Sequence, residues 1–360
     1  MIRFLINMVL FVLRLLPLVI VYIALYRDPG HQRLKKAGFQ EKDSIVGDVR
    51  FHYAESAGSG KPPLLLLHAQ LLDWFSYRNV MIQLAEHYHV YAADYPGHGK
   101  TRCPDDYEMN AEQIGSSLAQ FIEEVIGSPV YISGNSSGGL LAAWLAANRP
   151  DLVRAVILEA PPLFASEYPA VKNTVAYRTF TVSDRAVRED NEGDYVRFWI
   201  RNSEGFFKNN AFPGSRILVR ILVTVSRMLH WQDTVEIPFV PPLFREMIRG
   251  MDQYDPHFGQ AFCSGTWNEG FDHAEALCRI TCPVLLIQAD TSFLADGTLD
   301  GAMSEENAQF ACSRLQDVRY VKVNAGHVVH LEEPEEYLKH VRAFLETAGT
   351  DSRSGESGEV

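Results

Sequence analysis

The sequence has little positive charge for its length. Its 360 residues contain 33 Lys and Arg against 45 Asp and Glu, which gives a formal net charge of -12 and a pI near 5.5. A chain with this balance has no overall cationic field to attract a phosphate backbone. We therefore expect no nucleic-acid partner.

Cysteine is also scarce, with five residues spread along a chain that is too large to need disulfide staples. An odd number cannot all pair, and Cys278 with Cys282 lacks the second close pair that a zinc site would use. The sequence predicts free thiols and no metal site, which favours a reducing compartment.

A complete phosphate-binding loop is missing as well. Gly99, Lys100 and Thr101 follow a predicted strand, as they would in a P-loop. That motif needs a glycine five residues before Gly99, however, and position 94 is Asp. We expect no bound nucleotide and no other cofactor.

A long apolar run is present at the N-terminus. Residues 4–26 are mostly apolar and match a membrane-spanning length, and about 16 of them are Leu, Ile, Val or Phe. These contribute about -5 to -10 kcal/mol to insertion, against about +3 kcal/mol for Arg14. An uncleaved anchor is the first hypothesis; a cleaved signal peptide, which would need a small-residue cleavage site, and an interfacial helix stay open.

Basic residues follow this run more often than they precede it. Only Arg3 comes before it, whereas Arg27, Arg33, Lys35 and Lys36 come after it. The positive-inside rule then places the large domain on the cytosolic side of a membrane. Membrane lipid is accordingly an expected partner of residues 4–26.

From about residue 44 the chain alternates strand-like and helix-like segments, which is typical of an α/β domain with a mainly parallel sheet. Continuous apolarity predicts strands that are buried on both faces. The expected strands are 50–56, 63–70, 89–94, 130–134, 155–159, 284–290 and 319–323, and the expected helices are 77–87, 111–126, 139–148, 305–315 and 335–345.

One long interval breaks this alternation. Residues 163–272 show no strand pattern and hold nearly half of the chain's aromatic residues, so we expect an inserted, mostly helical lid. Its amphipathic stretch 217–229 could touch lipid or pack on the core. The expected organisation is an anchor and linker (1–43), a core in two parts (44–162 and 273–348), the lid between them, and a disordered tail (349–360).

The clearest chemical signal is G-N-S-S-G-G at residues 134–139, between a buried strand and an Ala- and Leu-rich helix. This is a G-x-S-x-G nucleophile elbow in its required strand-turn-helix context. A serine on so tight a turn has unfavourable backbone angles, and chains approach so closely that positions 134 and 138 must be small. Ser136 is the predicted nucleophile, and the turn directs the Ser137 N–H to where negative charge would develop.

With these motifs the chain resembles the α/β-hydrolase superfamily over residues 44–346. The segment L-H-A-Q at 67–70 is similar to the family's His-Gly-x oxyanion segment, with Ala69 where glycine is usual. The resemblance implies that the backbone N–H groups of Gln70 and Ser137 form an oxyanion hole. The stretch 94–101 is similar to the family's D-x-P-G-x-G-x-S loop.

A serine needs a neighbouring imidazole to accept its proton. The segment G-H-V-V-H-L-E-E-P at 326–334 supplies one, and it resembles the family's G-H-x-x-x-x-E-x-P pattern. His327 is the predicted base, and His330 is expected to be structural. His327 and His330 also have the spacing of a His-x-x-His metal-binding pair, but no carboxylate or thiol lies at a spacing that would complete a metal site.

The acidic member of the triad departs from the commonest family pattern, in which an Asp lies three residues past a glycine that ends the preceding strand. Ser292 occupies that position here. The superfamily's other location, at the end of the strand after the elbow helix, holds Glu159. Glu159 is the first choice, because an unpaired carboxylate at the end of a buried strand is costly; Asp290 and Asp296 remain alternatives.

The elbow and the acid placement also resemble zearalenone-type lactonases, a lid-bearing branch of the superfamily. Serine at the nucleophile position excludes the aspartate chemistry of haloalkane dehalogenases and epoxide hydrolases. We expect a membrane-anchored serine hydrolase that cleaves a small hydrophobic ester or lactone through an acyl-enzyme on Ser136. An acyltransferase using the same intermediate and a non-catalytic ligand-binding protein stay open.

Overall fold

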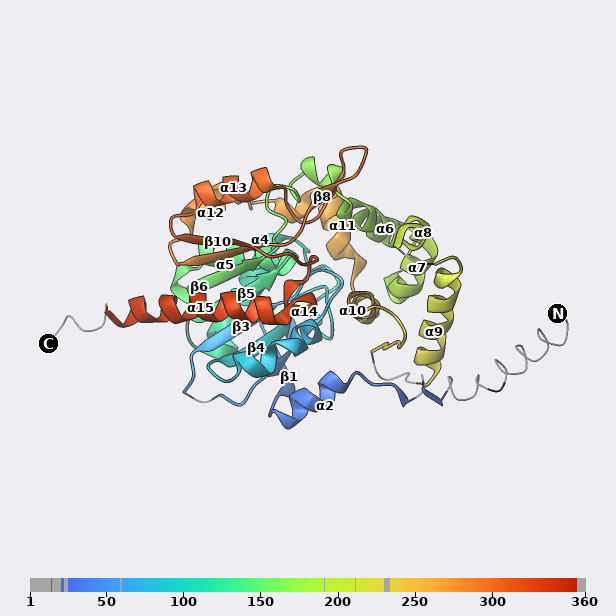
Figure 1. Ribbon diagram of the computed structural model, residues 1–360, viewed down its shortest axis with the longest axis horizontal. Coiled ribbons are helices and arrows are strands. Elements are labelled where there is room, and N and C mark those ends of the chain that lie inside the picture. Colours follow the sequence, from blue (N-terminus) through green and yellow to red (C-terminus); the bar gives the residue numbers. More distant parts are fainter. Residues whose placement is uncertain are drawn as a thin grey trace.

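In the computed structural model, the described residues are 25–58, 60–190, 192–210, 212–229 and 234–354, with Arg14, Val21 and Tyr22. Eight strands form one sheet in the order β1-β2-β4-β3-β5-β6-β7-β10. The β1–β2 and β2–β4 pairs are antiparallel and the others are parallel (Figure 1). The strands are β1 Gln40–Val46, β2 Val49–Glu55, β3 Pro63–Leu67, β4 His89–Asp94, β5 Val130–Asn135, β6 Val153–Glu159, β7 Val284–Gln288 and β10 Val318–Lys322.

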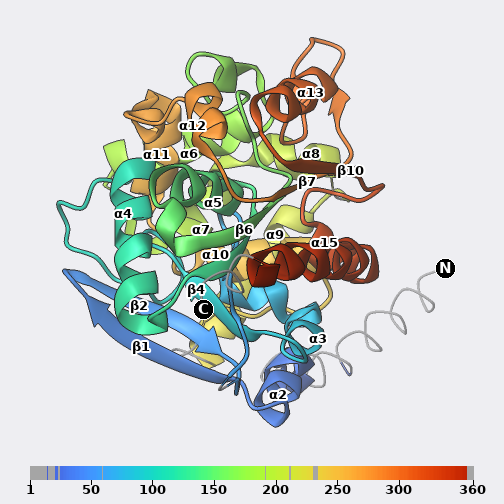
Figure 2. The same cartoon turned by 90° about the vertical axis from the view of Figure 1, so that its left-hand side faces the viewer.

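Helices cover both faces of this sheet, as the continuous apolarity of its central strands predicts. All five residues of β3 and all six of β5 are buried. The first face packs against α4 (Ala111–Phe121), α5 (Ser137–Asn148), α12 (His273–Arg279) and α13 (Glu305–Arg314). The second face packs against η1 (Trp74–Asn79), α3 (Met81–Leu84) and α15 (Pro334–Ser354). Figure 2 views the molecule nearly along the axis of α15.

The predicted segments correspond to observed elements, with local differences. The expected helix 77–87 is two short pieces, η1 and α3, and the expected helix 111–126 ends as the π-helical segment Ile122–Ile126. The sequence analysis did not predict β1, which begins at Gln40, ahead of the expected core boundary. Five of the seven β1 residues are exposed, so this edge strand lacks the apolar pattern on which the other strands were recognised.

Helices occupy the chain between β6 and β7. Before α12, which packs on the sheet, come α6 (Ala176–Arg188), α7 (Tyr195–Asn202), α8 (Glu204–Asn210), α9 (Ser215–Leu229), α10 (Pro242–Met251) and α11 (Pro256–Ser264). Helices α6 to α9 form the part of the molecule to the right in Figure 1. The described residues of this segment form no named strand; a single bridge joins Thr174 to Leu299. We keep the word lid for residues 163–272.

Buried charges tie the lid to the core, and His31 of α2 (Pro29–Lys36) lies 2.7 Å from the carboxylate of Glu236 in the lid. Arg249 of α10 lies 2.7 Å from the carboxylate of Asp73, and Arg78 of η1 lies 2.9 Å from that of Glu246 in α10. All four side chains are buried. Buried charges persist only when they are paired, so this network fixes α10 against the core.

The ends of the chain are only partly described. Most of the predicted anchor, residues 4–26, lies outside the described residues, and no helix within the described part is long and apolar enough to cross a bilayer. At the other end α15 reaches Ser354, inside the stretch expected to be a disordered tail. Residues 355–360 lie outside the described residues.

Candidate active site

Ser136 occupies the tight turn between β5 and α5. Its φ of 55° and ψ of -119° are angles that L-residues rarely adopt. A Cβ atom on Gly134 would lie 2.1 Å from the Gly138 carbonyl oxygen, and one on Gly138 would lie 2.3 Å from the Leu67 carbonyl oxygen. The glycines of the motif are therefore needed for close packing, as the sequence analysis inferred.

Asn135 joins the elbow to the two neighbouring segments that carry the other candidate residues. Its side-chain amide donates to the carbonyl oxygens of Glu159 (3.2 Å) and His327 (3.0 Å). The Ser136 N–H also donates to the Glu159 carbonyl oxygen, at 2.9 Å. Three segments far apart in sequence are held together at the carboxyl ends of β5 and β6.

A cavity of about 280 Å³ opens between the core and the lid. Ser136, Ser137, Gln70 and His327 all line it. Its other walls are mainly apolar, with contributions from Leu72, Val171, Phe180, Leu243, Met247 and Phe262. The predicted nucleophile, base and oxyanion residues thus share one apolar pocket, which is the usual character of a small-molecule site.

The predicted oxyanion residues are held by neighbouring hydrogen bonds. The Ser137 hydroxyl lies 2.9 Å from the Tyr95 hydroxyl, which in turn donates to the His68 carbonyl oxygen at 3.1 Å. The Gln70 side chain donates to the Tyr254 hydroxyl at 2.6 Å. Among the described residues no hydrogen bond uses the backbone N–H of Gln70 or Ser137, so both remain available to a ligand.

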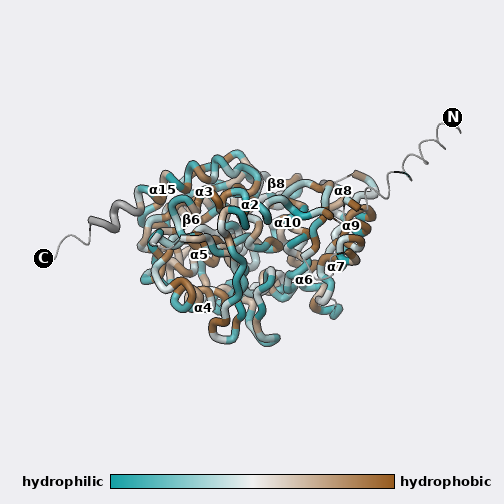
Figure 3. Tube along the Cα trace, turned by 90° about the horizontal axis from the view of Figure 1, so that it is seen from below, coloured by the Kyte–Doolittle hydropathy of each residue, from teal (hydrophilic) through white to brown (hydrophobic). Residues whose placement is uncertain are grey.

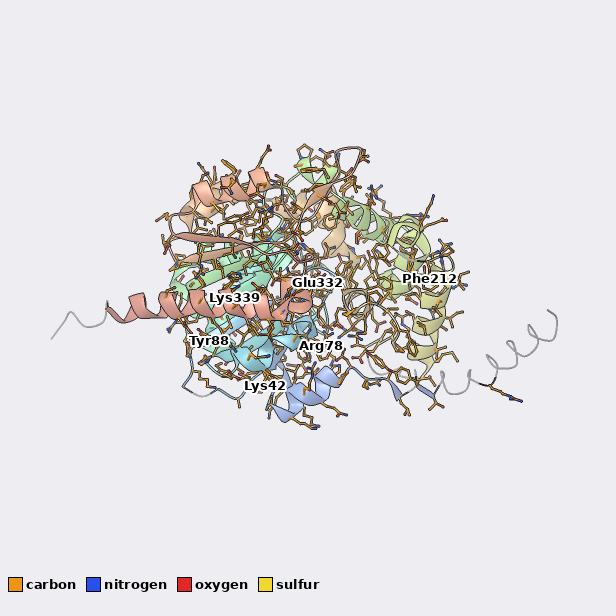
Figure 4. All side chains as sticks on the ribbon, viewed as in Figure 1. Lys42, Arg78, Tyr88, Phe212, Glu332 and Lys339 are labelled. Carbon is orange, nitrogen blue, oxygen red and sulfur yellow. The ribbon has the colours of Figure 1, made fainter. Side chains whose placement is uncertain are left out.

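His327 lies in the loop between β10 and α14 (Val329–Glu332). The Glu332 carboxylate folds back to accept the Val328 N–H at 3.1 Å, and a Cβ on Gly326 would meet it at 2.3 Å. This contact explains why glycine and glutamate bracket the histidine in the motif. Figure 4 places Glu332 on the lid side of the core.

The surroundings of His327 depress its basicity. Burial lowers the pKa of the ring below its ordinary value of 6.5, the Glu159 carboxylate opposes this by raising the pKa, and the His330 ring lowers it further. The ring is therefore neutral at pH 7, which is the form that accepts a proton.

Glu159 makes its hydrogen bonds to His330, in contrast to the predicted contact with the His327 ring. It accepts the His330 backbone N–H at 3.0 Å and faces Nδ1 of that ring at 2.8 Å, and both side chains are fully buried. Tyr77 stacks on the His330 ring with a centroid separation of 3.7 Å. Within the described residues the Glu159 carboxylate thus bonds to His330, and no hydrogen bond joins it to His327.

The two alternative acids lie away from the pocket. The Asp290 side chain is exposed, and Asp296 lies on the exposed turn of a small hairpin formed by β8 (Ser292–Phe293) and β9 (Leu299–Asp300). Neither belongs to the cavity lining.

The hairpin brings a different carboxylate to the cavity wall. Asp300, at the end of β9, lines the pocket with Ser136 and His327, and the sequence analysis did not consider it. The signal was present: Asp300 stands three residues past Gly297, which is the glycine-to-acid spacing expected after the preceding strand. Gly297 lies in the turn between β8 and β9, however, and not at the end of β7, where the pattern was sought.

The loop that imitates a P-loop has a structural role. The buried Asp94 carboxylate accepts the backbone N–H groups of Trp74 (2.8 Å) and Lys100 (2.9 Å). A Cβ atom on Gly99 would overlap this carboxylate, so the glycine serves the turn itself. The described residues also contain no cluster of ligands that could hold a metal ion.

Comparison with known proteins identifies the family of the chain. A family model described as alpha/beta hydrolase fold matches residues 62–334. Among curated proteins, the chloroplastic pheophytinase of Arabidopsis thaliana is 31% identical over 150 residues, which are 32% of this chain and 31% of that protein. The chain thus spans about a third of the length of the curated relatives it matches.

Solved structures align over a larger share of the chain than the curated relatives do. A lipase from Acinetobacter baumannii, described as putative, aligns with a TM-score of 0.64 at 22% identity, covering 89% of this chain and 96% of that one. A membrane phospholipase A, described as a bacterial virulence factor, aligns with a TM-score of 0.57 at 21% identity, covering 97% and 99%. At these identities the likeness concerns the fold alone. The family match covers most of the sequence, and the chain belongs to the alpha/beta hydrolase fold family.

Proposed function

We propose that this protein is a serine hydrolase that cleaves a carboxylic ester or lactone bond of a hydrophobic substrate. The observation that supports it most is the presence of Ser136, on its strained elbow, and His327 in the wall of one apolar cavity. The names of the structural neighbours, a lipase and a phospholipase A, agree with ester chemistry.

In the proposed reaction His327 accepts the Ser136 hydroxyl proton while the serine oxygen attacks the substrate carbonyl carbon. The backbone N–H groups of Gln70 and Ser137 stabilise the resulting oxyanion; loss of one such donor typically costs about 10²- to 10³-fold in rate. The tetrahedral intermediate collapses when His327 returns the proton to the leaving alcohol, which leaves an acyl-enzyme. Water then attacks the acyl group with the same histidine as base, and free acid and Ser136 are regenerated.

Glu159 is the proposed acidic residue that acts with Ser136 and His327. Its charge favours the imidazolium form of His327, which develops as the proton is transferred. His330 holds the carboxylate in place through its backbone N–H and Nδ1, so it acts as a positioning residue. Asp300 is the second candidate because it lines the same cavity.

The substrate class follows from the pocket walls. Aliphatic and aromatic side chains from the lid, including Phe180, Leu243 and Phe262, line the cavity and would favour an apolar acyl or alkyl group. The narrower resemblance to zearalenone-type lactonases stays a prediction. We further propose that residues 4–26 anchor the protein in a membrane, with the catalytic domain on the cytosolic side.

A fluorophosphonate probe tests the nucleophile, because it labels an activated serine irrespective of the natural substrate. We expect labelling of the full chain, its loss in Ser136→Ala, and its retention in Ser292→Ala, a matched change at an exposed serine in β8. A panel of esters and lactones of rising chain length then identifies the substrate class. Labelling that persists in Ser136→Ala, or appearance of only transacylated products when an alcohol is added, contradicts the proposal.

A further inference from the structure

The lid helix α9 has two different apolar faces. On its inner side, which faces the rest of the lid, Val219, Leu222 and Val223 are buried. On the other side Ile217, Ile221 and Met228 are 57%, 52% and 76% exposed, although they recur at the four- and seven-residue spacing of a single helix face. The amphipathic stretch singled out in the sequence therefore packs on the lid and presents an additional apolar stripe to the outside.

The surrounding surface extends this stripe. Leu218 and Leu229 of the same helix are 42% and 43% exposed, and Phe212 just before it is 62% exposed. Figure 3 shows the hydrophobic tube along α9 at the outer end of the lid, and Figure 4 places Phe212 there as well. Single exposed apolar residues are common, but a contiguous group on one helix marks an interaction surface.

Arginines border this stripe. Arg201 of α7 with Arg216 and Arg220 of α9 line a hollow of about 100 Å³, together with Ile200 and Ile217. Arg216 lies 3.8 Å from the carboxylate of Glu204, which is itself 81% exposed, and in the described part of the chain Arg201 and Arg220 form no ion pair. On a protein with a net charge of -12, three arginines around an apolar edge form a local site for an anionic group.

The N-terminal run reaches the body of the protein on the same side. Tyr22 packs on Phe239 with ring centroids 5.1 Å apart, and Phe239 is 67% exposed. The Tyr26 hydroxyl accepts a hydrogen bond from Arg245 of α10 at 2.8 Å. Leu25 between them is 77% exposed. The end of the apolar run is thus attached to the lid, which also carries α9.

We propose that the outer face of α9 and the arginine hollow beside it form a docking surface for an anionic phospholipid bilayer. The apolar stripe would enter the boundary between headgroups and acyl chains, and Arg201, Arg216 and Arg220 would bind lipid phosphates. Amphipathic helices with this arrangement lie in the membrane interface. Each arginine near an anionic surface strengthens binding by about fivefold. This inference is independent of the chemistry proposed for Ser136.

Hydrogen exchange on the full chain tests the proposal. The protein is incorporated into vesicles of phosphatidylcholine alone or of phosphatidylcholine with phosphatidylglycerol, and exchange is also measured in detergent. We expect the amides of α9 to exchange at least tenfold more slowly in the anionic vesicles than in either other condition. The β1–β2 hairpin should exchange equally in all three.

Two variants provide the matched comparison. Ile221→Glu places a charge in the stripe and should abolish the protection of α9, whereas Ile45→Glu places the same charge at a 77% exposed position on β1 and should preserve it. Thermal unfolding checks that both variants are folded. The double variant Arg216→Gln and Arg220→Gln keeps the apolar stripe and should also lose most of the protection of α9. It provides the test if Ile221→Glu misfolds.

Three results would overturn the proposal. Protection of α9 that is equal in detergent and in vesicles would mean that another part of this chain covers the stripe. Protection in detergent that rises with protein concentration would indicate a second copy as the occupant. Equal protection in neutral and anionic vesicles would remove the role of the arginines.

Discussion

Replacement of Glu159 by Gln perturbs the proposed site at its most informative point. The change keeps the size of the side chain and leaves one oxygen to accept the His330 backbone N–H, but it removes a buried negative charge. That charge raises the pKa of His327 against the effect of burial. The variant therefore loses stabilisation of the imidazolium that forms when Ser136 gives up its proton.

The size of the effect follows from this charge. A neighbouring opposite charge typically moves a pKa by about one to three units. At about 1.4 kcal/mol for each unit, the transition state loses about 1.4–4 kcal/mol, which corresponds to about 10- to 10³-fold in kcat/KM. The acid limb of the pH profile should move to lower pH in Glu159→Gln, because the group that raised the His327 pKa is gone.

The assay is the pH dependence of kcat/KM for a soluble ester, measured for the parent protein, Glu159→Gln, Asp300→Asn and Asp290→Asn. Asp290 is exposed and outside the cavity, so its variant should match the parent. Asp300→Asn should lose less than threefold. Full activity in Glu159→Gln together with a large loss in Asp300→Asn would refute the reasoning and assign the acid to Asp300. Denaturant unfolding separates these effects from loss of fold.

Three further predictions concern the basicity of His327, the elbow glycine and the buried ion pair of the lid. Because burial lowers the pKa of His327, the midpoint of the acid limb of kcat/KM for the parent protein should lie below pH 6.5; a midpoint above pH 6.5 contradicts this. Gly138→Ala should abolish activity or folding, because its Cβ would lie 2.3 Å from a carbonyl oxygen. Gly127→Ala has open space around it and should cost about 1 kcal/mol or more of unfolding free energy, because the φ of Gly127 is positive. Arg249→Met should cost about 3–5 kcal/mol of unfolding free energy in urea, because it leaves the buried Asp73 unpaired; a loss under 1 kcal/mol contradicts the network.

Much of the fold could be predicted because its central strands are apolar on both faces. β3 and β5 are continuous buried runs, and the elbow between β5 and α5 has a local sequence requirement that the Gly134 and Gly138 contacts explain. The edge strand β1 was missed for the opposite reason: its exposed, charged residues resemble a loop until the pairing partner β2 is known.

The candidate site was predictable only where a motif is contiguous. Ser136 and His327 stand in such motifs and line one cavity. The partner of Glu159 depends on how the His330 ring is oriented inside the core, which spacing alone does not determine. Asp300 was hidden because a short hairpin separates its glycine-to-acid pattern from the end of β7.

The most direct test of the proposed chemistry is the intact mass of the protein quenched during turnover of a slowly hydrolysed ester. The proposal predicts an increase equal to one acyl group, mapped by peptide analysis to Ser136 and absent when His327 is replaced by Ala. An unmodified protein during steady turnover, or an acyl group on a different residue, would contradict it.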